Sequence, residues 1–350
     1  MPFPFTRYPI IQAPMAGGAT TPELVAAVSN AGGLGSLAGA LLPPDRLREA
    51  IRQVRRLTDR PFNVNLFVLE AVEVESGMLE AALHRLQPIR AELGLPPGTA
   101  PQKFSEDFRA QLEVLLEEKP PVVSFHFDIV PAQVVERLHQ AGCQVIGTAT
   151  NRAEALAWEA AGADYICAQG GEAGGHRGTF MGPFEQSMTG TMALVPQLVE
   201  AVKIPVIAAG GIMDGRGIAA ALLLGASAVQ MGTAFLTCPE SGIHPLYKQA
   251  LLQAKGDPTV VTLTFSGRPA RGLHNAFIAR MQPYEAQVPP YPIQNALTSE
   301  IRQAAAKAGH TGYMSLWAGQ AVSLCRSMPA AMLVETLMQE TQTTLRSQCE

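Results

Sequence analysis

The feature that most constrains the fold is a repeated alternation between short apolar runs and longer segments with helical periodicity. The runs have the length of buried strands, and each is followed by a segment able to form a helix. The predicted strands are 10–15, 34–38, 62–68, 122–127, 144–149, 165–168, 205–209 and 228–231. Eight such units are the number needed to close a (β/α)8 barrel. The sequence therefore predicts an α/β protein built on a (β/α)8 TIM barrel.

The alternation is interrupted once and then ends. A polar, helix-rich segment at 70–115 follows the third predicted strand, and beyond 239 the pattern changes to turns, a proline-rich stretch and amphipathic helices. We therefore expect a barrel domain formed by 1–69 and 116–239, with an insertion at 70–115. The segment 240–350 is expected to form an additional smaller, mainly helical domain that covers the substrate and partly completes the barrel.

Charge and cysteine content exclude several classes of protein. A formal net charge of -4 over 350 residues provides no basic surplus, which argues against a nucleic-acid partner. The five cysteines are odd in number and lack CxxC spacing, so neither a disulfide framework nor a metal site is predicted. The N-terminus lacks signal-peptide features, and no apolar stretch has membrane-spanning length. A cytoplasmic protein without a membrane partner is expected.

The loop after the sixth predicted strand holds the strongest catalytic candidate. The segment 168–178, AQGGEAGGHRG, contains five glycines, one histidine and one arginine. Glycines permit positive φ and close approach of the backbone to a ligand, at an entropic cost that a plain turn does not require. Reacting groups in such barrels lie on loops at the C-terminal ends of strands. His176 is therefore the candidate catalytic residue, and the alternative is a mobile, solvent-exposed histidine.

Glycines also follow the seventh and eighth predicted strands, in AAGGI (208–212) and QMGT (230–233). Many barrels bind phosphate at these two loops through backbone N–H groups and a helix N-terminus. Side chains at Gly211 and Gly232 would block the approach of phosphate oxygens, and Thr233 could add a hydroxyl donor. We expect a phosphate-bearing ligand, although the same glycines could merely end strands in tight loops.

Amides within apolar strand runs need hydrogen-bond partners. Asn65 and Gln169 could bind the edge of a flat polar ring, with Met15 packing beneath it. The alternative, which we favour for Asn63, is that such amides satisfy loop backbone groups. His126 is expected to be a hydrogen-bonded residue of the core or rim. Because HExxH, GxSxG and paired-carboxylate motifs do not occur, metal-dependent hydrolysis, serine hydrolysis and glycosidase chemistry lose support.

Several longer blocks occur in order along the chain: IIQAPMAGG, AAVSNAGGLGSL, FNVNLF, AQGGEAGGHRG, IAAGGIMDGRGIAAAL, VQMGTAFL, FSGRPARG and MSLWAGQ. Together they resemble the class I nitronate monooxygenases, formerly called 2-nitropropane dioxygenases, which are FMN-dependent barrel enzymes. Enoyl-acyl-carrier-protein reductases and NADH:quinone reductases share the APMAGG, AGGH and AAGGI blocks, so PYPIQNAL and MSLWAGQ favour the nitronate enzymes. The chain departs from the family's usual pattern at Asp128, where a glycine is common, which leaves the shape of that rim open.

The resemblance implies that the barrel domain binds FMN. Cofactor contacts would come from the matching positions, which are Met15, Asn65, Gln169, Gly174, Gly211, Gln230, Met231, Gly232 and Thr233. Met15 would border the ring, the last five would hold the ribityl phosphate, and His176 would face the flavin N5 side and the substrate. The implied activity is oxidation of alkyl nitronates, such as propionate 3-nitronate, with O2 through one-electron transfer and a flavin semiquinone. This reaction detoxifies nitro compounds and consumes no nicotinamide cofactor.

Two other functions stay open: an NAD(P)H-dependent FMN reductase of quinones or enoyl thioesters, and a non-catalytic flavin-binding protein. The expected partners are a small nitronate and O2, and a homo-oligomer is possible. His176 would stabilise the anionic nitronate as an imidazolium or hydrogen-bond donor, or act as a general base toward a neutral nitroalkane. Tyr291, Tyr313, Trp317 and Gln320 are candidates for covering the substrate, although aromatic residues in helical segments are more often core.

Overall fold

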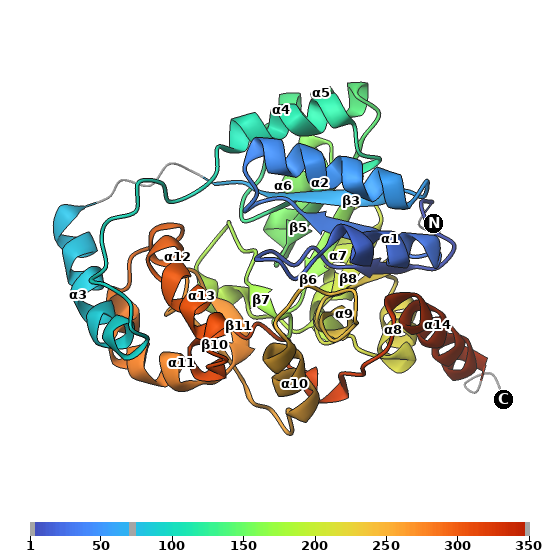
Figure 1. Cartoon of the computed structure of the whole chain (residues 1–350). Helices are drawn as coiled ribbons and strands as arrows, with labels where there is room; N and C mark the ends of the chain where they lie inside the picture. The colour runs from blue at the N-terminus through green and yellow to red at the C-terminus, as the bar shows by residue number, and fades with distance from the viewer. Residues whose placement is uncertain (1–3, 70–74, 347–350) are drawn as a thin grey trace.

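The computed structural model describes residues 4–69 and 75–346, and its larger part is a parallel β-barrel (Figure 1). The barrel strands are β1 (Ile10–Gln12), β2 (Gly35–Ala38), β3 (Phe62–Phe67), β4 (Val122–His126), β5 (Gln144–Ala149), β6 (Tyr165–Gln169), β8 (Val206–Ala209) and β9 (Ala228–Met231). They pair in the order β1-β9-β8-β6-β5-β4-β3-β2. Leu34, just before β2, forms a parallel bridge with Ile11 and so joins the two ends of the sheet. The predicted (β/α)8 fold is confirmed.

A ring of helices surrounds these strands. It consists of α1 (Pro22–Asn30), α2 (Pro44–Leu57), α4 (Phe108–Glu118), α5 (Ala132–Gln140), α6 (Arg152–Ala161), α7 (Thr191–Ala201), α8 (Gly215–Leu223) and α14 (Ala330–Arg346). Local sequence explains where these helices begin and which side faces the core. Thr21 caps α1, because its side chain accepts from the Leu24 N–H. The helix α2 buries Leu47, Ile51 and Val54 on one side. The helix α14 packs against α8 and α1, so the end of the chain supplies the eighth barrel helix (Figure 1).

Burial on both faces explains why the barrel strands are almost uniformly apolar. In β5, Val145 belongs to the cluster shared with the outer helices, whereas its neighbour Ile146 belongs to a separate apolar cluster contributed by the strands. In β6, Ile166 and Cys167 divide in the same way. Because successive side chains of a strand point to opposite faces, a strand in a barrel covered by helices needs apolar residues at nearly every position.

A second, smaller unit covers one end of the barrel (Figure 1). It contains α3 (Ser76–Glu92), α10 (Pro245–Gln253), α11 (Ala276–Met281), α12 (Ile293–Leu297), α13 (Ser299–Lys307) and an antiparallel sheet of β10 (Thr259–Thr262), β11 (Ala270–Leu273) and β7 (Gly175–His176). The helices, β10 and β11 share an apolar cluster that includes the stacked rings of Phe265 and Phe277. The remaining short helices are α9 (Thr233–Leu236), η1 (Phe184–Ser187), η2 (Gln282–Gln287), η3 (Thr311–Tyr313) and η4 (Val322–Leu324).

Two local differences from the predicted elements affect the site. The first strand ends at Gln12 instead of residue 15, because Pro14 has no N–H to donate and the following Gly17 and Gly18 adopt positive φ. The strands β10 and β11 were not predicted, and β11 matters because it pairs with the short strand that carries His176. Among the helices of residues 4–69 and 75–346, none has both the length and the apolarity to cross a bilayer.

Candidate active site

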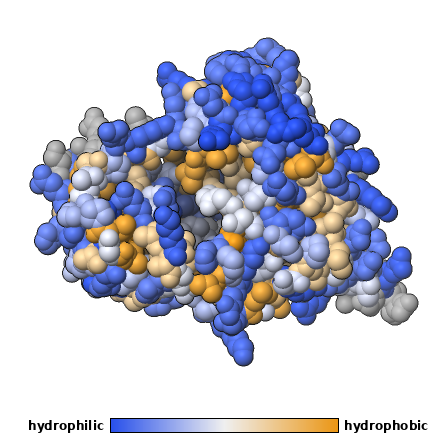
Figure 2. Space-filling view, in the orientation of Figure 1, coloured by the Kyte–Doolittle hydropathy of each residue, from blue (hydrophilic) through white to orange (hydrophobic). Residues whose placement is uncertain are grey.

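A cavity of about 1170 Å³ lies where the barrel meets α3, α12 and α13. Figure 2 shows it as a hollow in this face of the molecule. Every site residue predicted from the sequence lines it, namely Met15, Asn65, Gln169, Gly174, His176, Gly211, Gln230, Met231, Gly232 and Thr233. Tyr291 and Trp317, two of the predicted covering residues, also line it, whereas Tyr313 and Gln320 do not. The Tyr313 hydroxyl instead donates to the carboxylate of Glu92, the last residue of α3.

The ends of β8 and β9 present unpaired backbone donors to this cavity. Within the described residues, the N–H groups of Gly211, Gly232 and Thr233 have no hydrogen-bond acceptor. Gly211 adopts φ +70°, which favours glycine. The Thr233 hydroxyl accepts from the Gly319 N–H at 2.9 Å, which leaves its own proton available to a ligand. Backbone donors in proteins are rarely left unpaired, so this arrangement fits an anion such as a phosphate group.

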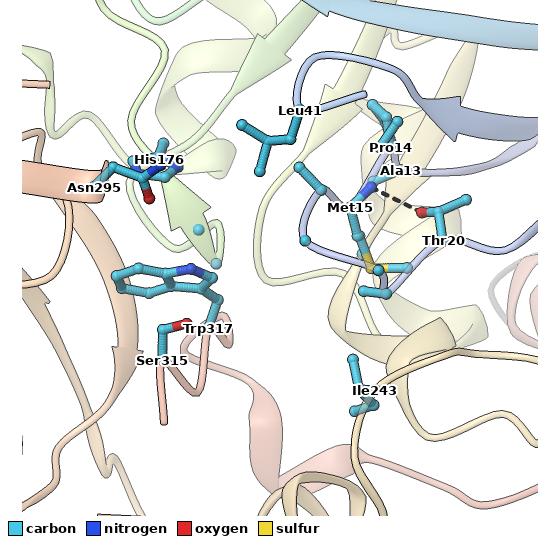
Figure 3. A pocket seen from close by; sticks show the side chains of 18 of the residues that line it. Ala13, Pro14, Met15, Thr20, Leu41, His176, Ile243, Asn295, Ser315 and Trp317 are labelled. Carbon is cyan, nitrogen blue, oxygen red and sulfur yellow. Dashed lines mark hydrogen bonds between the residues drawn. The ribbon is translucent and has the colours of Figure 1, made fainter. Parts of the chain in front are cut away.

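The opposite part of the cavity fits a flat, polar ring. The Asn65 Nδ2 donates to the carbonyl and hydroxyl oxygens of Ser124 at 3.1 and 3.0 Å. Its Oδ1 has no partner in the described part of the chain and can accept from an N–H at the edge of a ring. Figure 3 places Met15 across the cavity from His176 and Trp317, with the Met15 N–H bonded to the Thr20 hydroxyl at 2.9 Å. A ring bound between these two walls would contact the thioether on one side.

Gln169 and Gly174 also have structural roles, and these were not the main prediction from the sequence. The Gln169 Nε2 donates to the His176 carbonyl at 3.0 Å, and its Oε1 accepts from the Gly178 N–H at 2.8 Å. The Oε1 and Nε2 of Gln169 therefore satisfy backbone groups of the loop, which was the alternative interpretation of this side chain. A Cβ on Gly174 would lie 2.5 Å from the Ala318 carbonyl carbon, so close packing requires glycine there.

The backbone of His176 is held in place, unlike that of a mobile loop histidine. His176 pairs with Ala270 of β11, and its carbonyl accepts from Gln169 and from the His126 Nε2 at 3.2 Å. His126 is thus hydrogen-bonded, as predicted. The His176 ring lies 5.3 Å from Phe127, 5.5 Å from Tyr291 and 5.6 Å from Trp317, measured between ring centroids. The imidazole therefore sits in an aromatic enclosure at the cavity wall.

This enclosure keeps the imidazole neutral. Burial, with added repulsion from His126, Arg268 and Arg302, lowers the pKa of His176 from 6.5 to about 3. The Ser266 hydroxyl lies 2.9 Å from the Nε2 and donates its single proton to the Arg268 carbonyl at 3.0 Å. It must then accept from an Nε2–H, which leaves the lone pair on Nδ1. The hypothesis that His176 carries a positive charge is not supported at neutral pH in the free protein.

Positive charge near His176 comes from two arginines that the sequence analysis did not identify. Arg268 lies over the Phe127 ring at 4.2 Å and donates to the carbonyls of Phe127 and Thr179. Arg302, on α13, lines the cavity. The block FSGRPARG contains the first of these residues, but nothing in an amphipathic helix distinguishes a cavity-lining arginine from a solvated one. In the described part of the chain, His, Cys, Asp and Glu side chains form no group of three that could hold a metal ion.

Comparisons with known proteins show which family the chain resembles. The family model for nitronate monooxygenase matches residues 4–340. The chain is 46% identical over 336 residues to a probable nitronate monooxygenase of Staphylococcus saprophyticus, covering 95% of this chain and 94% of the relative. A probable nitronate monooxygenase of Staphylococcus aureus is 46% identical over 335 residues, with the same two coverages.

Solved structures extend the likeness. A nitroalkane oxidase from Streptomyces ansochromogenes is 44% identical, with 98% of each chain covered and a TM-score of 0.92. FabK from Thermotoga maritima is 34% identical, covering 98% of this chain and 95% of FabK, with a TM-score of 0.77. Because the family model spans nearly the whole chain and relatives of the same name match at 46% identity, the chain belongs to the nitronate monooxygenase family of oxidoreductases.

Proposed function

We propose that this protein is an FMN-dependent monooxygenase that oxidises alkyl nitronates such as propionate 3-nitronate with O2, and so detoxifies nitro compounds. Family membership supports the reaction class. The observation that supports this choice of substrate is the neutral, enclosed imidazole of His176 beside two half-buried arginines, Arg268 and Arg302.

The residues present fit FMN. The N–H groups of Gly211, Gly232 and Thr233 would hold its phosphate, and Asn65 would accept from the ring edge opposite Met15. Gln230 and Met231 would line the same side, and Gly174 and Gln169 would border the ring while supporting the His176 loop. When bound, the flavin would supply the electron acceptor, taking electrons from the nitronate one at a time and passing them to O2.

The low pKa of His176 favours a substrate that arrives already deprotonated. A general base works best when its pKa lies near the working pH, and an imidazole with a pKa of about 3 is a poor base for a carbon acid as weak as a nitroalkane. A nitronate needs no such base. It needs compensation of its negative charge, which the half-buried Arg268 and Arg302 would supply.

His176 can still donate a hydrogen bond to the nitronate. If the Ser266 hydroxyl turns from the Arg268 carbonyl to the Nε2, the imidazole proton moves to Nδ1, which has no partner within the described residues. An Nδ1–H could then donate to a nitronate oxygen, and the nearby anion would raise the pKa of the ring. In this proposal Ser266 is a positioning residue and His176 is the residue that contacts substrate.

The test is oxygen consumption by flavin-loaded protein with propionate 3-nitronate in the absence of NADH. We expect His176→Asn to lower turnover by roughly ten- to a thousandfold, the range for one electrostatic donor or acid–base group, with FMN still bound. Wild-type protein should use nitroethane at least ~100-fold less efficiently than ethyl nitronate, since it lacks an effective base. Equal use of both forms, or unchanged turnover in the variant, would remove the assigned role.

A second candidate function is reduction of an enoyl thioester or quinone by NAD(P)H through FMN, which the likeness to FabK of Thermotoga maritima supports. Anaerobic bleaching of the bound flavin by NADH, followed by reoxidation with an enoyl thioester, would favour it over nitronate oxidation.

A further inference from the structure

Four polar side chains form a cluster inside the barrel, and two of them line the cavity. They are Ser36 of β2, Asn63 and Asn65 of β3, and Ser124 of β4, each at most 4% exposed. Ser124 lies on the same face of its strand as Val122, which belongs to the apolar cluster contributed by the strands. In register, Asn63 lies beside Ser36 and Asn65 lies beside Ser124. Buried polar groups are costly unless they are paired, so the bonds of this cluster indicate what it holds in place.

Ser124 binds both protons of the Asn65 amide. The Asn65 Nδ2 donates to the Ser124 carbonyl at 3.1 Å and to the Ser124 Oγ at 3.0 Å. Because a carbonyl oxygen can only accept, the Asn65 atom that faces it must be the nitrogen. The Asn65 Oδ1 is therefore the atom that this side chain offers to the cavity, which both residues line.

The Ser124 hydroxyl is itself held by a second amide. The Asn63 Nδ2 donates to the Ser124 Oγ at 2.9 Å, so Asn63 does not satisfy loop backbone groups with this nitrogen, as the sequence had led us to expect. Two N–H groups thus occupy both lone pairs of one hydroxyl oxygen. The hydroxyl cannot turn away from Asn65 without leaving a buried N–H unpaired, which is costly. The orientation of the Asn65 amide is therefore fixed from within the barrel.

A fixed acceptor selects one position on a flavin ring. The oxidised isoalloxazine ring has a single N–H, at N3, between two carbonyl groups that can only accept. An Asn65 side chain that was free to turn could offer its NH2 group to one of those carbonyls instead, with no need for the N3 proton. The two bonds from Asn65 to Ser124 prevent this turn.

We propose that Ser124 is a positioning residue for the flavin, which holds the Asn65 carbonyl oxygen toward the cavity so that the site requires the N3 proton. The inference rests on the FMN binding of the proposed function and concerns the cofactor, whichever substrate is oxidised. Ser124 acts through Asn65, which contacts the ring.

The test compares FMN with N3-methyl-FMN, which lacks the N3 proton, by fluorescence titration of the flavin-free chain. In Ser124→Ala we expect the dissociation constant for FMN to rise ~3- to 10-fold, because the Asn65 amide loses one of its two anchoring hydrogen bonds. The constant for N3-methyl-FMN should stay within about twofold, since the lost bond orients an acceptor that this ligand does not use. Ser124→Thr keeps the hydroxyl and should restore the wild-type ratio of the two constants.

Ser36→Ala is the matched control. It removes another buried barrel hydroxyl, whose oxygen has no hydrogen-bond partner within the described residues. Both dissociation constants should stay at their wild-type values in this variant. Thermal unfolding of each variant shows whether the fold is intact.

Equal weakening of both ligands in Ser124→Ala would show that the hydroxyl contacts the ring itself or only supports the barrel, and would overturn positioning through Asn65. Unchanged binding of FMN would overturn it too, as would a ratio in Ser124→Thr as low as in Ser124→Ala. Because the readout is binding, the inference can hold even if the loaded protein oxidises no nitronate. A wild-type chain that binds no FMN would refute the cofactor assignment and this inference together.

Discussion

Burial of the His176 imidazole should make the folded protein lose stability in mild acid. The pKa of this group falls from 6.5 to about 3 on folding, chiefly because burial penalises the charged form. The unfolded chain therefore takes up the proton first as the pH drops. The contribution of His176 to stability is complete above pH 6.5 and is lost progressively as the pH falls toward 3. At about 1.4 kcal/mol per pH unit, the loss between pH 6.5 and 5 is about 2 kcal/mol.

The variant His176→Asn removes this titration. Urea unfolding of wild type and variant, each at pH 7.5 and pH 5.0 with the same excess of FMN, gives the change in the free energy of unfolding for both. We expect wild type to lose about 2 kcal/mol more than the variant over this interval. His126, whose pKa burial also lowers to about 3, is present in both proteins, so its own loss cancels.

His84→Gln, which removes an exposed histidine of α3, is the matched control for the loss of a histidine elsewhere in the chain. Identical losses in wild type and His176→Asn would show that the imidazole is solvated or charged in the folded protein. The site would then have no reason to prefer a substrate that arrives already deprotonated.

Three further substitutions test the site. Gly211→Ala places a Cβ on a residue with φ +70°, 3.2 Å from the Glu172 Cβ, and should weaken FMN binding about 5- to 30-fold in a fluorescence titration. Gly174→Ala overpacks the contact with Ala318 and should lower the free energy of unfolding by about 1–3 kcal/mol, whereas Gly77→Ala, which meets no atom within 4 Å, should not. Ser266→Ala should lower kcat/KM on nitronates ~3- to 10-fold with unchanged flavin content, and a wild-type value would exclude a positioning role for this hydroxyl.

The barrel was predictable because its strands are buried on both faces and read as short, mostly apolar runs between helical segments. The same signal fails for β10 and β11, which are four residues long and contain Thr and Arg. Within the described residues, β10 pairs only with the neighbouring β11, and β11 in turn pairs with a distant segment, the two residues of β7. No local sequence pattern indicates such a partner.

The lining of the cavity was predictable because glycines and amides stand out at the ends of strands. The individual structural roles of these residues were not predictable. Gly174 is required by packing on Ala318, and the Gln169 amide supports the His176 loop, facts that depend on contacts between distant segments. Arg302 escaped notice for the same reason, since only the folded chain shows that it lacks a carboxylate partner.

We propose above that this cavity binds FMN and passes electrons from a nitronate to O2 without a nicotinamide. Anaerobic titration of the yellow protein, followed by absorbance, tests it directly. We expect propionate 3-nitronate to reduce the flavin, NADH to leave it oxidised, and admission of air to restore the original spectrum. A protein that takes up no FMN, or a flavin that NADH bleaches and the nitronate does not, would contradict the claim.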